Sequence, residues 1–400
     1  MTTHDTTQNN KKLIHMIRKF LPFAAVAIMT VSCSDNDAPD TPAANGKDAT
    51  FEAIARQYLA NTVNVTYSNL ADNAEQLVED LKRVQADKSD ANIRKACESF
   101  LEARKWWERS EAFLYGAAAD FGIDPHIDSW PLDRAGLVAE MSNAGHIASL
   151  AAEDGDAWAG AHLGPELLGF HGIEYIIFAA GAPKAASSIP DNELTYAIAV
   201  AGDLRNKTYQ LELSWGGEEA VSSDRLAKVD EELEWPYTVA NSGVSYTDNM
   251  LNAGKAGSTY RTWTHAMEAI IDGCMDIADE VGTQKIGKPH TGEDVNYIES
   301  PYSYKSITDF HDNMISIENA YMGGIPERRD EAKSLHAYIM SVNPALDTRL
   351  TAAIRNAQDK IAAMQAPFVL YYTHSSAREA MDACRDLSDA LTEVKLQLSK

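Results

Sequence analysis

VNVTYSNLADNAEQLVEDLKRV, residues 63 to 84, carries apolar side chains that are spaced alternately by three and four positions. In an α-helix this spacing gathers them on one face, whereas a strand would place them at every second residue. The apolar face is therefore expected to pack against other helices. Its members are Val63, Tyr67, Leu70, Ala74, Leu77, Leu81 and Val84.

The same pattern recurs far along the chain, in residues 260–281 and 380–398, and no segment has the convincing alternation of a strand. Long helices with one apolar stripe pack as antiparallel neighbours in bundles, so the sequence predicts an all-α protein. Breakers cluster from Trp235 to Gly257 and roughly halve the chain. We therefore expect two helical-bundle subdomains, residues 51–240 and 241–400.

The N-terminus is predicted to carry an export signal. Basic residues precede the uncharged stretch 20–32, which is too short to span a bilayer and ends at Cys33. A cysteine after Thr30-Val31-Ser32 resembles a lipobox, so we expect residues 1–32 to be a signal peptide and Cys33 to carry the lipid. Residues 33–50 then read as a flexible tether. The protein is expected in the cell envelope, as an outer-membrane lipoprotein on the periplasmic face or at the cell surface.

The charge of the chain limits its partners. With 59 Asp and Glu against 35 Lys and Arg, the formal net charge is −24. Such a surface repels phosphate backbones and anionic lipid heads, so we expect no nucleic-acid partner and a membrane contact through the lipid anchor only. Beyond Cys33 the cysteines are widely spaced, which indicates buried fillers and neither a disulfide scaffold nor a cysteine zinc site. They are Cys97, Cys274 and Cys384.

Two predicted helices carry ionisable residues on their apolar faces. Arg104 and Glu111 interrupt the stripe of residues 93–114, and His171 and Glu174 lie three positions apart in residues 167–178. Burying a charge costs several kcal/mol unless it is paired or coordinates something. An imidazole and a carboxylate on one helix face are also how helical bundles build metal sites. The pattern therefore predicts either a structural ion network or a metal site.

These residues lie in stretches that resemble a known family. GFHGIE, residues 169–174, is similar to the G-x-H-x-x-E motif of the imelysin-like proteins, also classed as the M75 peptidase family. Four further blocks resemble the family in the same order, and the resemblance covers about residues 60–395. The blocks are RKWWERSEAFLYG (104–116), IDSWP (127–131), ESPYS (299–303) and NAYMG (319–323).

The resemblance implies an imelysin-like fold of two helical subdomains, with a site near their interface and a link to iron uptake. It also implies which residues form the site. His171, Glu174 and Glu111 would be metal ligands, and the expected neighbours are Arg104, Asp128, Trp130 and Ser303.

Three functions fit this resemblance. The first is a metal-binding accessory factor of iron uptake, which would bind iron or an iron chelate and work with other envelope iron-uptake proteins. Its cofactor would be a divalent or ferric metal, iron or zinc, and Arg104 would hold a carboxylate or an anionic chelate.

The second function is an M75-type metallopeptidase, with zinc on His171 and Glu174 and a third ligand such as Glu111 or His126. The chain lacks the H-E-x-x-H motif of many zinc peptidases, which argues against this function without excluding it. The third is a metal-free lipoprotein that binds a peptide or a glycan.

Overall fold

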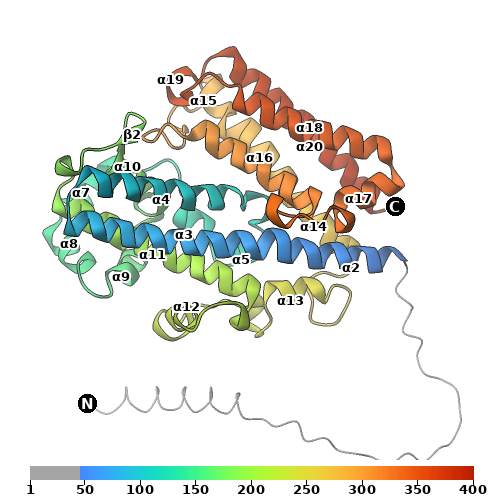
Figure 1. Cartoon of the computed structure of the whole chain (residues 1–400), viewed down its shortest axis with the longest axis horizontal. Coiled ribbons are helices and arrows are strands. Elements are labelled where there is room, and N and C mark those ends of the chain that lie inside the picture. Colours follow the sequence, from blue (N-terminus) through green and yellow to red (C-terminus); the bar gives the residue numbers. More distant parts are fainter. Residues whose placement is uncertain (1–45) are drawn as a thin grey trace, which may run out of the picture. The chain divides into compact units, whose positions relative to one another are not determined.

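The computed structural model describes residues 46–400, so the predicted signal peptide, Cys33 and most of the tether lie outside the described residues. Helices dominate this part of the chain (Figure 1). The described strands are two short ones that pair antiparallel, β1 (Phe178–Ala179) and β2 (Ala182–Pro183). The all-α prediction is confirmed. None of the described helices is long and apolar enough to cross a membrane.

The first group of helices forms around α3 (Asn64–Ala86), which contains the apolar stripe of residues 63–84. It packs along α4 (Asp90–Glu108) and α11 (Asp191–Gly216). A π-helical turn, η1 (Leu59–Val63), joins it to α2 (Gly46–Tyr58). Ser89 begins α4 by accepting a hydrogen bond from the Asn92 amide, a typical N-cap.

The second group brings together α14 (Trp263–Glu280), α16 (Ser306–Met322), α18 (Pro344–Ala362) and α20 (Ser375–Leu398). It lies beside α4 and α3 in Figure 1. Contacts of α16 with α4, and of α14 with α2, join the two groups. Residues 46–400 thereby form one unit of contacts, and a boundary near residue 240 stays a prediction.

Shorter helices fill the connections within and between the two groups. They are α5 (Ala117–Asp120), α6 (Asp124–Ile127), α7 (Arg134–Met141), α8 (Ala144–Leu150), α9 (Gly155–His162), α10 (Gly169–Ile177), α12 (Ser223–Leu226), α13 (Tyr246–Leu251), α15 (Gly287–Thr291), α17 (Leu335–Val342) and α19 (Phe368–Tyr371). Single turns of 3₁₀ or π geometry are η2 (Glu111–Phe113), η3 (Pro165–Leu167), η4 (Ala186–Ser188), η5 (Glu218–Ala220), η6 (Ala227–Glu232), η7 (Val239–Asn241), η8 (Val281–Lys285), η9 (Pro326–Arg328) and η10 (Glu331–Lys333).

Two helix ends decide where charged side chains lie. The helix α4 ends at Glu108, so Glu111 leaves the stripe that it was predicted to share with Arg104 and begins the 3₁₀ turn η2. Gly282 reads as a helix stop, yet the chain continues from α14 through the π turn η8 as far as Lys285. A π turn contains one residue more than an α-helical turn, so the residues after it point to a different side of the helix than α-helical spacing would give. Cys97, Cys274 and Cys384 are buried and free, as expected.

Candidate functional site

The helix α10 places His171 and Glu174 on its buried side, one turn apart. It can begin where it does because Gly169 has a φ of +64°, and a Cβ at this position would lie 1.9 Å from the Ile127 carbonyl oxygen. A side chain there would push α10 away from α6. The first glycine of the motif thus fixes how closely His171 approaches the segment around Asp128.

His171 lies between two carboxylates. Its Nε2 is 3.1 Å from Asp128 Oδ1, at ion-pair distance but without hydrogen-bond alignment, and its Nδ1 is 3.8 Å from Glu174 Oε2. The ring of Trp130 packs on the imidazole, with 4.4 Å between centroids. Burial alone would lower the pKa of His171, but Asp128 and Glu174 overcome burial and raise it to about 9. The side chain is therefore an imidazolium at neutral pH.

Glu174 ties α10 to the loop before α16. Its Oε1 accepts hydrogen bonds from the amides of Tyr302 (3.1 Å) and Ser303 (2.7 Å). Ser300 and Tyr304, on either side, have φ of 49° and 61°, so the loop is tightly turned. The glutamate of the motif thus holds two chain segments together and leaves only Oε2 without a hydrogen bond.

Arg104 lies at the centre of the buried charges and is 2% exposed. Its guanidinium pairs with Asp128 and with Glu108 (2.5 Å to Oε1), and it is 3.7 Å from Glu299 and 3.9 Å from Asp309. Despite burial, this cation and His171 hold the pKa of the Asp128 carboxyl well below its usual range. The Trp107 indole also donates to Asp128 Oδ2, at 2.7 Å.

Lys285 brings a second buried cation from η8. Its Nζ is 3.3 Å from Glu299 Oε2, 3.7 Å from Glu111 Oε1 and 3.9 Å from Glu108 Oε2. We name the whole set the charge cluster. Its members are Arg104, Glu108, Glu111, Asp128, His171, Glu174, Lys285, Glu299 and Asp309.

The charge cluster holds more carboxylates than cations. Burial, the largest cause, raises the pKa of Glu111, Glu299 and Asp309, and neighbouring carboxylates add to the rise. The surplus of negative charge is therefore relieved by protons, or by a cation that binds there.

Four buried polar atoms near the motif have no hydrogen-bond partner among the described residues. Such atoms are rare in folded proteins because each costs free energy when it is left unsatisfied. Each belongs to His171, to Glu174 or to a residue that contacts one of these two. The atoms are His171 Nε2, Glu174 Oε2, Trp130 Nε1 and Ser303 Oγ.

The expected site residues are thus largely brought together. His171, Glu174, Arg104, Asp128, Trp130 and Ser303 surround one point, whereas Glu111 contacts Lys285 on the far side of Glu108. His126 is instead 2.7 Å from Asp203. Within residues 46–400, no group of three or more His, Cys, Asp or Glu side chains is arranged to hold a metal ion. The motif thus offers two adjacent candidate ligands.

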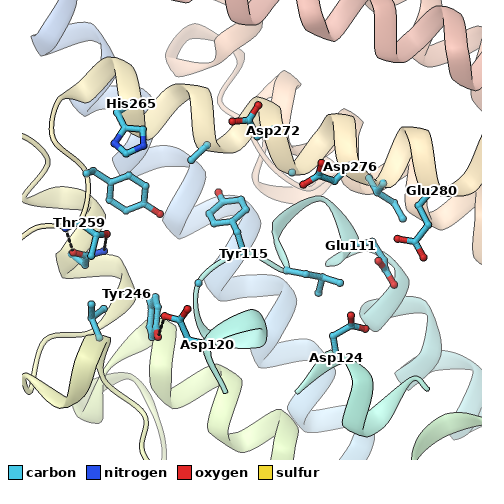
Figure 2. Close-up of a pocket in the computed structure, with 18 residues that line it drawn as sticks. Glu111, Tyr115, Asp120, Asp124, Tyr246, Thr259, His265, Asp272, Asp276 and Glu280 are labelled. Atoms are coloured by element: carbon cyan, nitrogen blue, oxygen red, sulfur yellow. Dashed lines mark hydrogen bonds between the residues drawn. The ribbon is translucent and has the colours of Figure 1, made fainter. Parts of the chain in front are cut away.

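Glu111 also lines a cavity of about 630 Å³ that the sequence did not predict (Figure 2). We name it the acidic pocket. Six carboxylates and His265 line it, and neither Lys nor Arg is among the described residues of its wall. The carboxylates are Glu111, Asp120, Asp124, Asp272, Asp276 and Glu280.

The acidic pocket lies between α14 and segments that come after α4 in the chain. Asp272, Asp276 and Glu280 succeed one another along α14, and Glu111, Asp120 and Asp124 lie across the cavity from them in Figure 2. Gly273 allows this approach, because a Cβ there would lie 2.2 Å from the Ala112 carbonyl oxygen of η2. Tyr246 and Asn249 of the predicted linker region form another part of the wall.

The pocket carboxylates differ in how they are compensated. Asp272 pairs with Lys395 (2.5 Å), and Asp120 accepts a hydrogen bond from the Tyr246 hydroxyl (2.6 Å). Asp124, Asp276 and Glu280 have neither a hydrogen bond nor an ion pair from their side chains to the described part of the chain.

The environment of Asp124 and Asp276 also disfavours their negative charge. Burial and the nearby Asp128 raise the pKa of Asp124 to about 7. Partial burial, with Asp272 and Asp279 close by on the same helix, raises the pKa of Asp276.

Sequence patterns could have found part of what was missed. Glu108 comes four positions after Arg104, the usual spacing of a helical ion pair. Lys285 continues the spacing of Cys274, Ile277 and Val281 by one more step of four. Glu299 begins the ESPYS block, but no local pattern indicates that Glu299 or Asp309 is buried beside Arg104, because their positions depend on how α16 and the loop before it pack against α4.

Comparisons with known proteins agree with this fold. A family model described as imelysin (peptidase M75) matches residues 64–398. The chain is 27% identical over 312 residues to iron-regulated protein A of Synechococcus elongatus. The matched region covers 78% of this chain and 75% of that protein.

Two crystal structures resemble the chain over most of its length. One is of an iron-regulated protein A precursor from Parabacteroides distasonis, with a TM-score of 0.73 at 27% identity, over 89% of this chain and 98% of that one. The other is of an imelysin-like protein from Psychrobacter arcticum, with a TM-score of 0.55 at 14% identity, over 88% of this chain and 94% of that one. At this identity the likeness bears on the fold alone.

Proposed function

Because the chain belongs to the imelysin family, we propose that it serves iron acquisition at the cell envelope by binding a metal cation at His171 and Glu174. Two of its relatives carry the name iron-regulated protein A, which supports the link to iron. In this proposal the lipid on Cys33 holds the protein at the outer membrane, and other envelope iron-uptake proteins are its partners.

The observation that carries the proposal is the group of four unsatisfied polar atoms around the motif. Once a metal displaces the imidazolium proton, His171 and Glu174 would supply a nitrogen and an oxygen, which suit iron, zinc or manganese. Trp130 contacts His171 and Ser303 contacts Glu174, and each carries an unsatisfied donor that would hold a water or a small anion near the metal. A bound metal would act there as a Lewis acid and as the cargo itself.

The number of ligands favours a carrier over a peptidase. Catalytic zinc usually has three protein ligands and an open position. Here the third expected ligand, Glu111, faces Lys285, and the nearer Asp128 is already paired with Arg104. A site with two protein ligands binds a metal weakly and releases it readily, which suits a protein that passes its metal on.

The proposal is tested by metal content. We expect the tag-free full chain, dialysed to equilibrium against iron or zinc, to hold close to one metal ion per chain in excess of the dialysate, as measured by mass spectrometry. His171→Ala and Glu174→Ala should both lose it. The matched control is His146→Ala, because His146 forms a similar histidine–glutamate pair with Glu140 at the surface.

Absence of metal under every loading condition, with the variants folded, would contradict the proposal. Metal that survives both substitutions would also contradict it, since the metal would then lie elsewhere.

A further inference from the structure

We propose that the acidic pocket binds a linear organic polycation, a polyamine whose ammonium groups are separated by short aliphatic chains. This site is distinct from the metal site proposed at His171 and Glu174, and the inference does not rest on that function. The proposal depends on how the charges are distributed, on which of them lack partners, and on the unpaired hydroxyl of a largely buried tyrosine in the wall.

The carboxylates of the acidic pocket are spread along the cavity. Asp272, Asp276 and Glu280 each lie one turn apart on α14, so neighbours are separated by about 6 Å along the helix axis. Glu111, Asp120 and Asp124 face them from the opposite wall (Figure 2). No three acids or histidines of residues 46–400 converge on a point where one metal ion could bind them. Separated charges favour a ligand whose own charges are separated.

Three carboxylates of the pocket form no ion pair with the described chain. Lys395 pairs with Asp272 at one end, and Lys285 lies 3.7 Å from Glu111 at the other. Asp276, Glu280 and Asp124 have no such partner in the described chain. Asp276 is exposed and Glu280 is half-buried, so a ligand can reach them from solvent. The chain thus leaves two or three carboxylates for a cation from outside.

The hydroxyl of a largely buried tyrosine provides evidence that is independent of the carboxylates. Tyr260 lines the cavity and is only 9% exposed, yet its hydroxyl has no hydrogen-bond partner among residues 46–400. Burial, and then the charge of Asp120, raises the pKa of this hydroxyl, so it lies near a carboxylate of the cavity wall. An unsatisfied polar group in such a position is expected to bond to a ligand or to water. A neutral tyrosine hydroxyl can accept a hydrogen bond from an ammonium group.

The remaining wall suits the aliphatic part of such a ligand. Leu114, Ala269 and Ile277 present apolar surface, and the rings of Tyr115 and Tyr246 can contact ammonium groups through their faces. An extended chain of four methylenes, with bonds of about 1.5 Å, separates its two nitrogens by about 6 Å, which equals the spacing of Asp276 and Glu280 along α14. A volume of about 630 Å³ lies within the usual range for small-molecule sites.

The test is calorimetric titration of the full chain with spermidine, 1,4-diaminobutane, butylamine and magnesium chloride at low salt. We expect spermidine to bind more tightly than 1,4-diaminobutane, and both to bind more tightly than butylamine or Mg²⁺. Added salt should weaken binding, because the contacts are between charges partly open to solvent.

Variants locate the binding. Asp276→Asn combined with Glu280→Gln should weaken spermidine at least about tenfold, and Tyr260→Phe should weaken it severalfold. The matched control is Asp279→Asn, an exposed acid of the same helix that does not line the cavity, and it should change affinity less than about twofold. Circular dichroism checks that each variant is folded.

Three results would overturn the proposal: Mg²⁺ or butylamine binding as tightly as spermidine, a spermidine Kd weaker than about 1 mM, or equal weakening by the control variant. The metal proposal is judged separately, because it depends on His171→Ala and Glu174→Ala, and neither residue lines this cavity.

Discussion

The charge cluster and the acidic pocket share Glu111, yet the chain treats carboxylates in opposite ways in the two regions. In the cluster, Arg104, Lys285 and His171 lie among the buried acids. In the pocket, Asp276 and Glu280 form no ion pair with the described chain, although Lys395 and Lys285 act on them from farther away. An uncompensated charge in the interior costs several kcal/mol, whereas water stabilises one at the wall of an open cavity. A carboxylate without an ion pair is therefore tolerated only where water can reach it, and a ligand can reach the same place.

The largest expected effect comes from removing the central cation of the cluster. Arg104→Met leaves Asp128 and Glu108 buried without their guanidinium, so we expect the free energy of unfolding to fall by about 3–5 kcal/mol. Urea denaturation measures the change. The control is Arg385→Met, whose partners Asp382 and Asp386 lie at the surface, and it should cost less than about 1 kcal/mol. Equal losses in the two variants would mean that burial does not distinguish these ion pairs.

The next effect depends on pH. The pKa of His171 is raised to about 9 by Asp128 and Glu174, with Arg104 opposing them. A group whose pKa is raised on folding stabilises the protein fully below its unfolded pKa of about 6.5, and this stabilisation is lost as pH rises through 9. The stability advantage of the native chain over His171→Gln should therefore shrink between these values, by up to about 3 kcal/mol. An advantage that is constant over this window would contradict the imidazolium.

The smallest expected effect is a change in stability when one carboxylate of the acidic pocket is neutralised. Asp276→Asn removes a charge that Asp272 and Asp279 repel more than Lys395 of α20 attracts it, so the free energy of unfolding should rise by a few tenths of a kcal/mol in thermal denaturation. Stabilisation on removal of a charge is typical of a residue kept for binding. A loss of more than about 1 kcal/mol would instead mean that Asp276 has a structural role.

The sequence was sufficient for the fold and for the core of the motif. Periodicity predicted the helices because the apolar stripes are local patterns, and the i, i+3 spacing predicted that His171 and Glu174 share a buried face. The resemblance placed Asp128, Trp130 and Ser303 near them, and each contacts one of the two.

The acidic pocket could not be predicted in the same way. Its walls come from η2, α5, α6, α13 and α14, and no local pattern states that these segments meet. The segment from Trp235 to Gly257 was predicted as a boundary because it is rich in breakers, yet Val239, Tyr246 and Asn249 of this segment line the cavity. Breakers indicate where helices stop, and they carry no information about what the turns then contact.

The π turn η8 also bears on how the protein tolerates changes in chain length. It lies between α14 and α15, and Lys285 reaches the charge cluster from its last position. Loss of one residue there would restore α-helical spacing and rotate the downstream part of the helix by about 100°. Lys285 would then leave Glu111 and Glu299 without their shared cation. Substitutions in this turn are thus expected to be inherited more readily than insertions or deletions.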